Sequence, residues 1–233
     1  MNIGGFEKYS FIDFPGCISS VVFTRGCNFC CPYCHNPELV QPGCEVQDAA
    51  VSEEDVLSFL EKRRKYVDGV VITGGEPFLQ PDLPEFCQQL KMLGFSIKID
   101  TNGSRPEMLA EVIRDGLADY IAMDVKTDPE RYAPLIAREL DPERIRRSIE
   151  IIIGAGLPHE FRTTCVRPIV DEPAVRVIAE MLRGASLHAL QKPRSEKVLD
   201  PAFFEQNQWQ FSDAELDAFQ SILSQSVHRC IIR

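Results

Sequence analysis

Residues 27–36 read CNFCCPYCHN, and the interpretation of the whole chain starts from this stretch. Three of its cysteines, Cys27, Cys31 and Cys34, follow the spacing C-x3-C-x2-C. Thiolates are soft ligands that suit iron–sulfur clusters or zinc. Because a 4Fe–4S cluster has four irons, three thiolates from one short loop would leave the fourth iron open to a small molecule. The spacing therefore predicts a catalytic iron–sulfur site rather than a simple electron store.

A structural zinc site is the alternative for these thiols. Cys27 with Cys30, and Cys31 with Cys34, can be paired as two abutting C-x2-C knuckles. Zinc sites built from two knuckles usually separate them by about a dozen residues or more, so that the chain can wrap the ion. Here no residue separates them, which disfavours zinc. Cys30 is then interpreted as a bystander in the loop.

The composition is that of an ordinary globular protein. The chain has 233 residues, 44% of them hydrophobic and 26% charged, which predicts one α/β domain over residues 1–233. No apolar run is long enough to span a bilayer, and the N-terminus lacks the regions of a signal peptide. We therefore expect a cytoplasmic protein whose nine cysteines are reduced thiols or metal ligands. The net charge of −10 argues against a nucleic-acid partner.

Strand and helix patterns alternate about six times. The predicted strands cover residues 19–23, 69–72, 95–99, 120–123, 160–164 and 187–190, and predicted helices begin at residues 52, 83, 106, 144, 173 and 212. Residues 1–18 are predicted to form an N-terminal arm with a hairpin over 6–14, and 227–232 a last edge strand. Residues 35–51 and 192–210 are predicted to be irregular. Such alternation predicts parallel strands, and six units favour a partial (β/α)6 barrel over residues 19–233.

Polar groups recur where the predicted strands end. They are the cysteine stretch, Gly74-Gly75-Glu76-Pro77, Asp100-Thr101-Asn102-Gly103, Asp124-Val125-Lys126 and Arg162. Any one of them is explained by a tight turn or a helix cap. Together they offer close backbone approach, an acceptor for an ammonium group, a cation for a carboxylate and an acid for ribose hydroxyls. This set would hold an amino acid joined to a nucleoside.

The same motifs resemble those of a known family. The cysteine spacing and GGEP at residues 74–77 resemble the radical S-adenosylmethionine (SAM) superfamily, and DTNG at 100–103 and DVK at 124–126 resemble its glycyl-radical-enzyme activases. The opening residues 4–16 and the NPEL at 36–39 are most similar to anaerobic ribonucleoside-triphosphate reductase activating proteins.

The resemblance implies one 4Fe–4S cluster on Cys27, Cys31 and Cys34, with SAM on its open iron. It implies SAM contacts from Tyr33, Gly74, Gly75, Glu76, Asp100, Asn102, Asp124, Lys126 and Arg162. It also implies a monovalent cation beside SAM, held by Asp100, Thr101 and Asp124.

The implied reaction is reductive cleavage of SAM to a 5′-deoxyadenosyl radical, which removes a hydrogen from a glycine of a partner enzyme. The implied partners are a glycyl radical enzyme, with anaerobic ribonucleotide reductase as the first candidate, and a flavodoxin or ferredoxin as electron donor. Four alternatives stay open: an activase of the pyruvate formate-lyase type, a radical SAM enzyme acting on a small molecule such as a 7-carboxy-7-deazaguanine synthase, an iron–sulfur electron carrier, and the zinc protein.

The other cysteines and histidines receive structural interpretations. Cys17, Cys44, Cys87, Cys165 and Cys230 form no C-x2-C pair, so we predict buried small hydrophobes rather than a second cluster. His159, His188 and His228 are isolated in sequence and are interpreted as structural.

Overall fold

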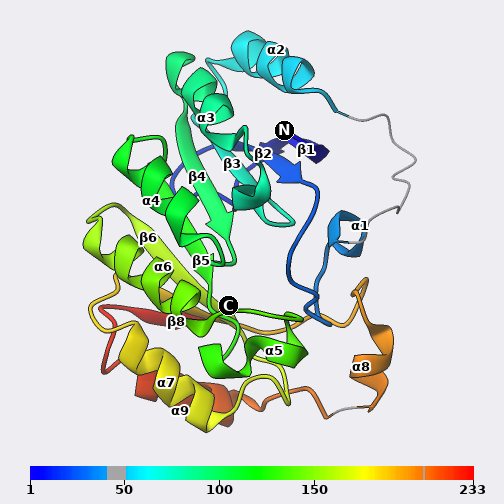
Figure 1. Cartoon of the computed structure of the whole chain (residues 1–233), viewed down its shortest axis with the longest axis vertical. Helices are drawn as coiled ribbons and strands as arrows, with labels where there is room; N and C mark the ends of the chain where they lie inside the picture. The colour runs from blue at the N-terminus through cyan, green and yellow to red at the C-terminus, as the bar shows by residue number, and fades with distance from the viewer. Residues whose placement is uncertain (41–50, 207) are drawn as a thin grey trace. The chain divides into compact units, whose positions relative to one another are not determined.

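A computed structural model describes residues 1–40, 51–206 and 208–233, and Figure 1 shows how strands and helices alternate along them. The chain divides into two compact units. The first unit comprises Met1–Asn28, Glu38–Thr101 and Glu107–Ile121, and the second comprises Phe29–Pro37, Asn102–Pro106 and Ala122–Arg233. The prediction of a single domain over residues 1–233 stays a prediction.

The first unit is built on four neighbouring strands. They are β1 (Ile3–Ser10), β2 (Ser19–Thr24), β3 (Gly69–Gly74) and β4 (Ser96–Thr101). β3 runs parallel to both β2 and β4, whereas β1 is antiparallel to β2. Val21 and Val22 of β2 and residues 70–72 of β3 are buried, as expected for parallel strands covered on both faces. The predicted N-terminal arm does form a hairpin, but its second strand is β2 rather than residues within 6–14.

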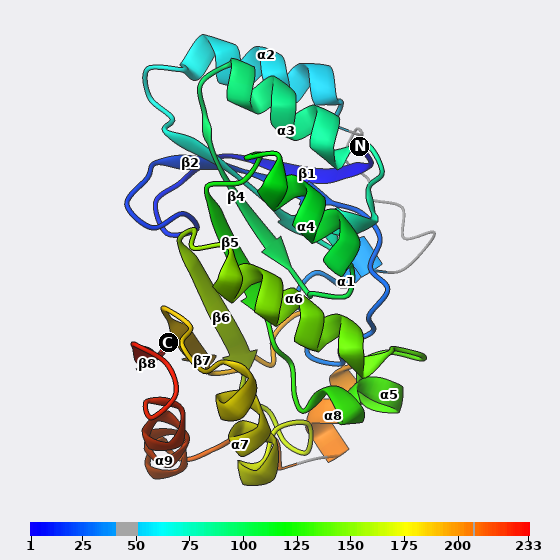
Figure 2. The same ribbon diagram turned by 60° about the vertical axis from the view of Figure 1, so that its left-hand side comes forward.

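Helices of the first unit follow the predicted pattern. α2 (Glu53–Arg63) begins at a capping box in which Ser52 and Asp55 satisfy each other's backbone N–H groups. α3 (Leu83–Met92) is followed by Gly94 at a positive φ of 86°, the position of a C-terminal glycine cap. α4 (Pro106–Arg114) opens with a proline. Figure 2 shows α2 and α3 side by side in this unit.

Residues 35–51 were predicted to be irregular, but Pro37–Val40 forms a single helical turn, α1. Residues 35, 36 and 51 are irregular as predicted, and the rest of that stretch, together with Cys44, lies outside the described residues. A short 3-10 helix, η1 (Pro77–Leu79), follows β3 and was also missed. Elements this short bury too few side chains to leave a periodic signal.

The second unit is built on three parallel strands. They are β6 (His159–Thr164), β7 (His188–Gln191) and β8 (Cys230–Ile232), with β7 next to both others. β5 (Tyr120–Asp124) begins in the first unit and ends in the second. The predicted edge strand over 227–232 is confirmed as β8, which extends the parallel set by one strand beyond the predicted six.

The longer helices of the second unit are α6 (Pro142–Gly154), α7 (Glu172–Met181) and α9 (Asp213–Leu223). A short helix, α5 (Tyr132–Leu135), follows the 3-10 helix η2 (Pro129–Arg131). Another short helix, α8 (Pro201–Gln206), comes after β7. α7 and α9 lie side by side in both views (Figures 1 and 2). The loop prediction over residues 192–210 is therefore wrong at α8. The Phe204 ring makes edge-to-face contacts with Phe203 and with Trp209, and such contacts follow no helical period.

Within the described ranges, no helix is both long and apolar enough to cross a membrane.

Cys87 and Cys165 are buried as predicted, and burial raises the pKa of each thiol to about 12. Cys17 and Cys230 are only partly buried.

The Ser52 cap can be tested by truncation. Ser52→Ala removes the side-chain acceptor for the Asp55 N–H, so we expect the free energy of unfolding to fall by about 1 kcal/mol in urea denaturation. Ser58→Ala, in the interior of the same helix, is the matched control and should leave stability unchanged or slightly raised. Equal losses in both variants would contradict the capping role.

Candidate active site

The cysteine loop, residues 27–36, follows β2 directly. Gly26 makes the turn at a positive φ of 92°, and its N–H donates to the Leu39 carbonyl at 2.8 Å. Cys27, the first predicted ligand, comes next in the first unit and is partly buried. A parallel strand thus delivers the first thiol at its carboxyl end, where α/β enzymes place catalytic groups.

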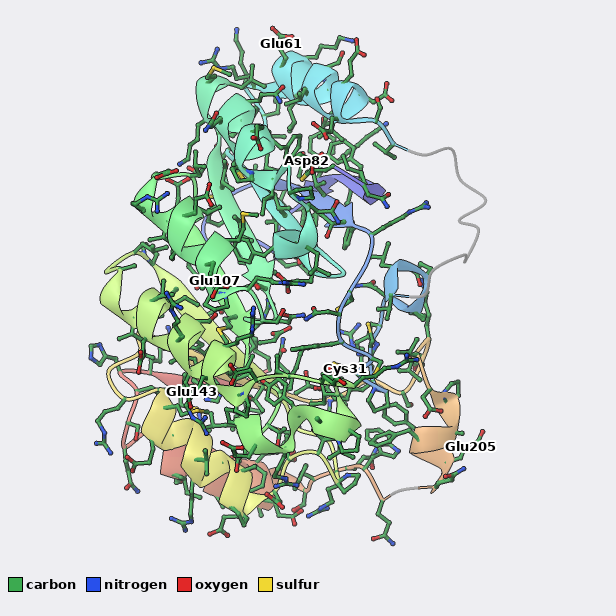
Figure 3. The ribbon with its side chains drawn as sticks, viewed as in Figure 1. Cys31, Glu61, Asp82, Glu107, Glu143 and Glu205 are labelled. Atoms are coloured by element: carbon green, nitrogen blue, oxygen red, sulfur yellow. The ribbon has the colours of Figure 1, made fainter. Side chains whose placement is uncertain are left out.

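In the second unit the loop continues through Cys31, which is buried, and Cys34, which is partly buried. Figure 3 shows Cys31 on this part of the loop. The Cys34 N–H donates to the Cys31 carbonyl at 3.0 Å, which closes a tight turn. Two backbone hydrogen bonds from residues 199 and 200 stabilise this turn. The Leu199 N–H donates to the Cys34 carbonyl and the Asp200 N–H to the Pro32 carbonyl, both at 3.0 Å.

Cys30 has a role that its sequence position did not indicate. Its backbone N–H and its thiol both donate to the Ile136 carbonyl, at 2.7 and 3.3 Å. The neighbouring Phe29 ring packs edge-on against Tyr132, with centroids 5.6 Å apart. Residues 132–136 therefore anchor the loop immediately before Cys31. Only the folded chain brings these segments together, so no sequence pattern could have signalled this contact.

Among the described residues, no group of three or more His, Cys, Asp or Glu side chains is arranged as a ready metal site. The cysteine motif is thus the basis for assigning the cluster ligands, and that assignment stays a prediction.

Gly74 and Gly75 permit a close backbone contact within the first unit. Gly74 has a positive φ of 113°, and a Cβ on Gly75 would lie 2.0 Å from the Gly26 carbonyl oxygen. The Gly75 N–H donates to the Thr24 carbonyl at 2.9 Å, and the Glu76 N–H to the Gly26 carbonyl at 2.8 Å. The glycines therefore fit against the turn that leads into Cys27. Their predicted contact with a ligand stays a prediction.

Glu76 is fully buried, and it meets one of the other predicted site residues. Its Oε1 accepts from the Thr101 hydroxyl at 2.8 Å and from the Phe78 N–H at 3.1 Å. Asp100 forms an ion pair with Lys98, whose side chain is 2% exposed. The first unit thus brings Glu76 and Thr101 together and gives Asp100 a protein cation as partner.

Gly75→Ala tests the close contact between these backbones. The new Cβ must displace the Gly26 carbonyl, so we expect the free energy of unfolding to fall by about 2 kcal/mol or more. Gly154→Ala is the control, because no heavy atom lies within 4 Å of its Cβ position. That variant should be neutral or stabilised by up to about 1 kcal/mol. Similar urea midpoints for the two variants would exclude the steric argument.

In the second unit, one carboxylate is shared by two cations. Asp124 Oδ2 accepts from Lys126 Nζ at 2.8 Å, and Asp124 Oδ1 accepts from Arg162 Nε at 2.7 Å. Burial alone would raise the pKa of Asp124, but the charges of Arg162 and Lys126 outweigh it and hold that pKa well below its usual range. Burial alone would lower the pKa of Lys126, and Asp124 raises it well above normal. All three groups are therefore charged, and the Glu160 carboxylate lies 3.9 Å from Arg162 as a second anion.

Tyr33 lies beside this group. Lys126 Nζ is 5.9 Å from the centroid of its ring, within the range of a cation–π contact. The Tyr33 hydroxyl is buried and has no hydrogen-bond partner among the described residues. Burial and then the nearby Cys31 raise the pKa of Tyr33 well above its usual value, so the hydroxyl remains a donor. A buried donor without an acceptor is expensive, which suits a site built to receive a further group.

Asn102 stabilises the turn in which it lies. Its Oδ1 accepts from the Ser104 N–H at 2.9 Å, and the next residue, Gly103, has a positive φ of 77°. This φ strains any residue with a Cβ, and a Cβ here would also require the Met123 side chain to move. The second unit thus explains Asn102 and Gly103 as turn residues, and ligand contact by Asn102 stays a prediction.

Two residues that the sequence did not single out, Tyr132 and Thr163, position the segment from Asp124 to Lys126. Tyr132 Oη accepts from the Lys126 N–H at 2.8 Å, and the Thr163 hydroxyl donates to the Val125 carbonyl at 2.7 Å. His188 Nε2 lies 3.0 Å from that hydroxyl. Burial lowers the pKa of His188 to about 3, so it is neutral, and the structural interpretation of this histidine agrees with its place.

Asp124→Asn tests whether this carboxylate holds the group together. The variant removes the carboxylate that two largely buried cations share, so we expect a loss of about 2 kcal/mol in unfolding free energy. A carboxylate whose pKa is depressed by folding stabilises the protein above its unfolded pKa of about 3.9 and loses that effect as the pH falls. The difference between wild type and variant should therefore be largest above about pH 5 and shrink below about pH 4. A constant difference across this range would contradict the ion-pair origin.

Comparison with known proteins identifies the class. The family model described as "Radical SAM superfamily" matches residues 21–181. A Methanocaldococcus jannaschii protein, assigned by inference as a glycyl-radical enzyme activating enzyme, is 34% identical over 86% of this chain and 83% of its own length. The pyruvate formate-lyase-activating enzyme of Listeria monocytogenes is 33% identical over 58% of each chain.

Solved structures share the fold at low identity. Streptococcus suis SuiB bound to the precursor peptide SuiA aligns over 91% of this chain with a TM-score of 0.65 and 13% identity. Escherichia coli coproporphyrinogen III oxidase, a radical SAM enzyme, aligns over 88% with a TM-score of 0.60 and 16% identity. The chain spans about half the length of each, 47% and 52%.

This chain belongs to the radical SAM superfamily. The predicted family and the predicted α/β fold of parallel strands are confirmed. The family implies a 4Fe–4S cluster and SAM as cofactors. The residues of the second unit fit SAM by their chemistry. A positive group suits its carboxylate, the acid Asp124 suits its ribose hydroxyls, and the Tyr33 ring suits its adenine.

Proposed function

We propose that the chain is a radical SAM activating enzyme that cleaves SAM reductively and removes a hydrogen from a glycine of a partner enzyme. The observation that carries this proposal is the group of Asp124, Lys126 and Arg162 beside Tyr33. Its charges and ring suit the carboxylate, ribose and adenine of SAM. The similarity to the M. jannaschii protein, which spans most of both chains, supports the activating role.

The cluster ligands in this proposal are Cys27, Cys31 and Cys34. When bound, the cluster and SAM supply the one-electron cleavage that drives hydrogen abstraction. The chain's own residues bind and orient. In the first unit, Gly74, Gly75 and Glu76 are assigned to the methionine ammonium group.

In the second unit, Lys126 and Arg162 provide positive charge for the methionine carboxylate, Asp124 accepts from ribose hydroxyls and Tyr33 stacks near the adenine. Asn102 and Asp100 complete the proposed SAM contacts. The proposal also includes a monovalent cation held by Asp100, Thr101 and Asp124 beside SAM.

The partner in this proposal is anaerobic ribonucleotide reductase, on the resemblance of residues 4–16 and 36–39 to its activating proteins. A pyruvate formate-lyase-type partner is the second candidate, favoured by the match to the Listeria enzyme. A cytoplasmic location and a flavodoxin or ferredoxin as electron donor belong to the same proposal.

Electron paramagnetic resonance tests the proposed function. The anaerobically reconstituted protein, reduced with dithionite, is mixed with SAM and each candidate glycyl radical enzyme. We expect a glycyl doublet with one candidate, together with release of 5′-deoxyadenosine. SAM cleavage without a protein radical on either candidate would favour a small-molecule substrate, and an intact reduced cluster that never cleaves SAM would favour an electron carrier.

Two cysteine variants separate the metal assignments. Cys31→Ser should abolish the cluster and SAM cleavage, whereas Cys30→Ser keeps a donor for the Ile136 carbonyl and should retain iron content. Loss of iron in both variants would make Cys30 a cluster ligand, and zinc in place of iron in the native protein would support the two-knuckle zinc site.

A further inference from the structure

A groove of about 720 Å³ lies between α2 and α3 of the first unit, the two helices that Figure 2 shows side by side. Three apolar side chains, Leu57, Met92 and Leu93, share it with carboxylates from α2. The Met92 side chain is 77% exposed, so the described residues leave this part of the groove uncovered. None of these residues belongs to the proposed cofactor site.

Charges of opposite sign lie at the two ends of α2. Its first turn holds Glu53, Glu54 and Asp55, and its last turn holds Lys62 and Arg63. The helix dipole favours this order, so the order alone does not indicate a partner. Glu53 pairs with the amino terminus and Asp55 belongs to the capping box, which leaves Glu54 as the acid of this turn that is available to another molecule.

One face of α2 carries an acid, a small residue and a base at equal intervals. Glu54, Ser58 and Lys62 are four residues apart, so they lie on the same side of the helix. Glu54 and Lys62 are exposed and form no ion pair within the described part of the chain. Each lies about 6 Å along the axis from Ser58, whose small side chain lets a second helix approach closely.

We infer that this groove is the docking site of a second copy of the chain, whose α2 lies antiparallel to the first and crosses it at Ser58. A two-fold axis through that crossing brings Glu54 of each copy to Lys62 of the other, so both ion pairs form together. A parallel arrangement would instead oppose like charges. Leu57 and Met92 supply the apolar contact between the charged ends.

Charge complementarity selects a second copy as the occupant. Two chains of net charge −10 repel each other overall, so they associate only where local charges are complementary. The base that Glu54 needs is present on the same face of the same helix, at the spacing that a two-fold axis requires. Because α2 has only 11 residues, the interface is small and the dimer is expected to form at micromolar concentrations.

The test is a charge swap in the full-length, reconstituted protein. Lys62→Glu opposes two acids across the two-fold axis, and Glu54→Lys/Lys62→Glu restores opposite charges with their places exchanged. Arg229→Glu, at an exposed position just before β8 of the second unit, makes the same charge change away from the groove and is the matched control. Sedimentation equilibrium gives the dimer dissociation constant of each protein at low salt and at about 0.5 M salt.

We expect Lys62→Glu to weaken the dimer about tenfold or more at low salt, with a smaller effect at high salt. The double variant should return to within about threefold of the wild type, and Arg229→Glu should change the constant less than about twofold. Both substitutions in the double variant oppose the helix dipole, so its recovery would not be an effect of helix stability. Met92→Ser removes apolar contact in the groove and should weaken the dimer at both salt concentrations.

Three results would overturn the inference. A wild type that stays monomeric up to about 200 μM would leave the groove to a different, basic partner or to none. A dimer that tolerates Lys62→Glu would use another surface. A double variant as weak as the single one would exclude direct pairing of the two charges. Far-UV circular dichroism of each variant confirms that the helices are folded, and none of these measurements depends on the proposed function.

Discussion

The Asp124 carboxylate accepts from both Lys126 and Arg162, and the candidate binding surface of the second unit depends on this arrangement. Two cations at low exposure repel each other and lose hydration, so they stay together only with a shared anion. Backbone bonds from Thr163 and to Tyr132 keep the segment in place around it. The result is a group of charges held in one arrangement, with Glu160 3.9 Å from Arg162 as a further carboxylate.

The first unit relies on a different constraint, the close approach of two backbones. Gly75 lies against the Gly26 carbonyl at a distance that no Cβ allows, and Glu76 bonds to the same carbonyl. The glycine motif and the turn into Cys27 therefore depend on each other's conformation. Glycines interpreted from sequence as room for a ligand serve at least one other purpose, which is to let two loops of the same unit pack.

Both units place their polar groups at the carboxyl ends of parallel strands, which is where crossover connections leave loops free to vary. The radical SAM superfamily uses that edge for its cofactors, and the proposed activating function follows from the groups found there.

The sequence by itself determined the family, most strands and helices, and the residue types of the site. Those features are local: the cysteine spacing, the caps at Ser52 and Ser212, and short apolar runs between turns. Tertiary structure alone decided that β1 pairs with β2, that Phe204 of α8 contacts Trp209, and that Tyr132 and the Ile136 carbonyl hold Lys126 and Cys30. The Cys30 contact joins residues 106 positions apart, and the energies of all these contacts depend on packing and burial that no local pattern encodes.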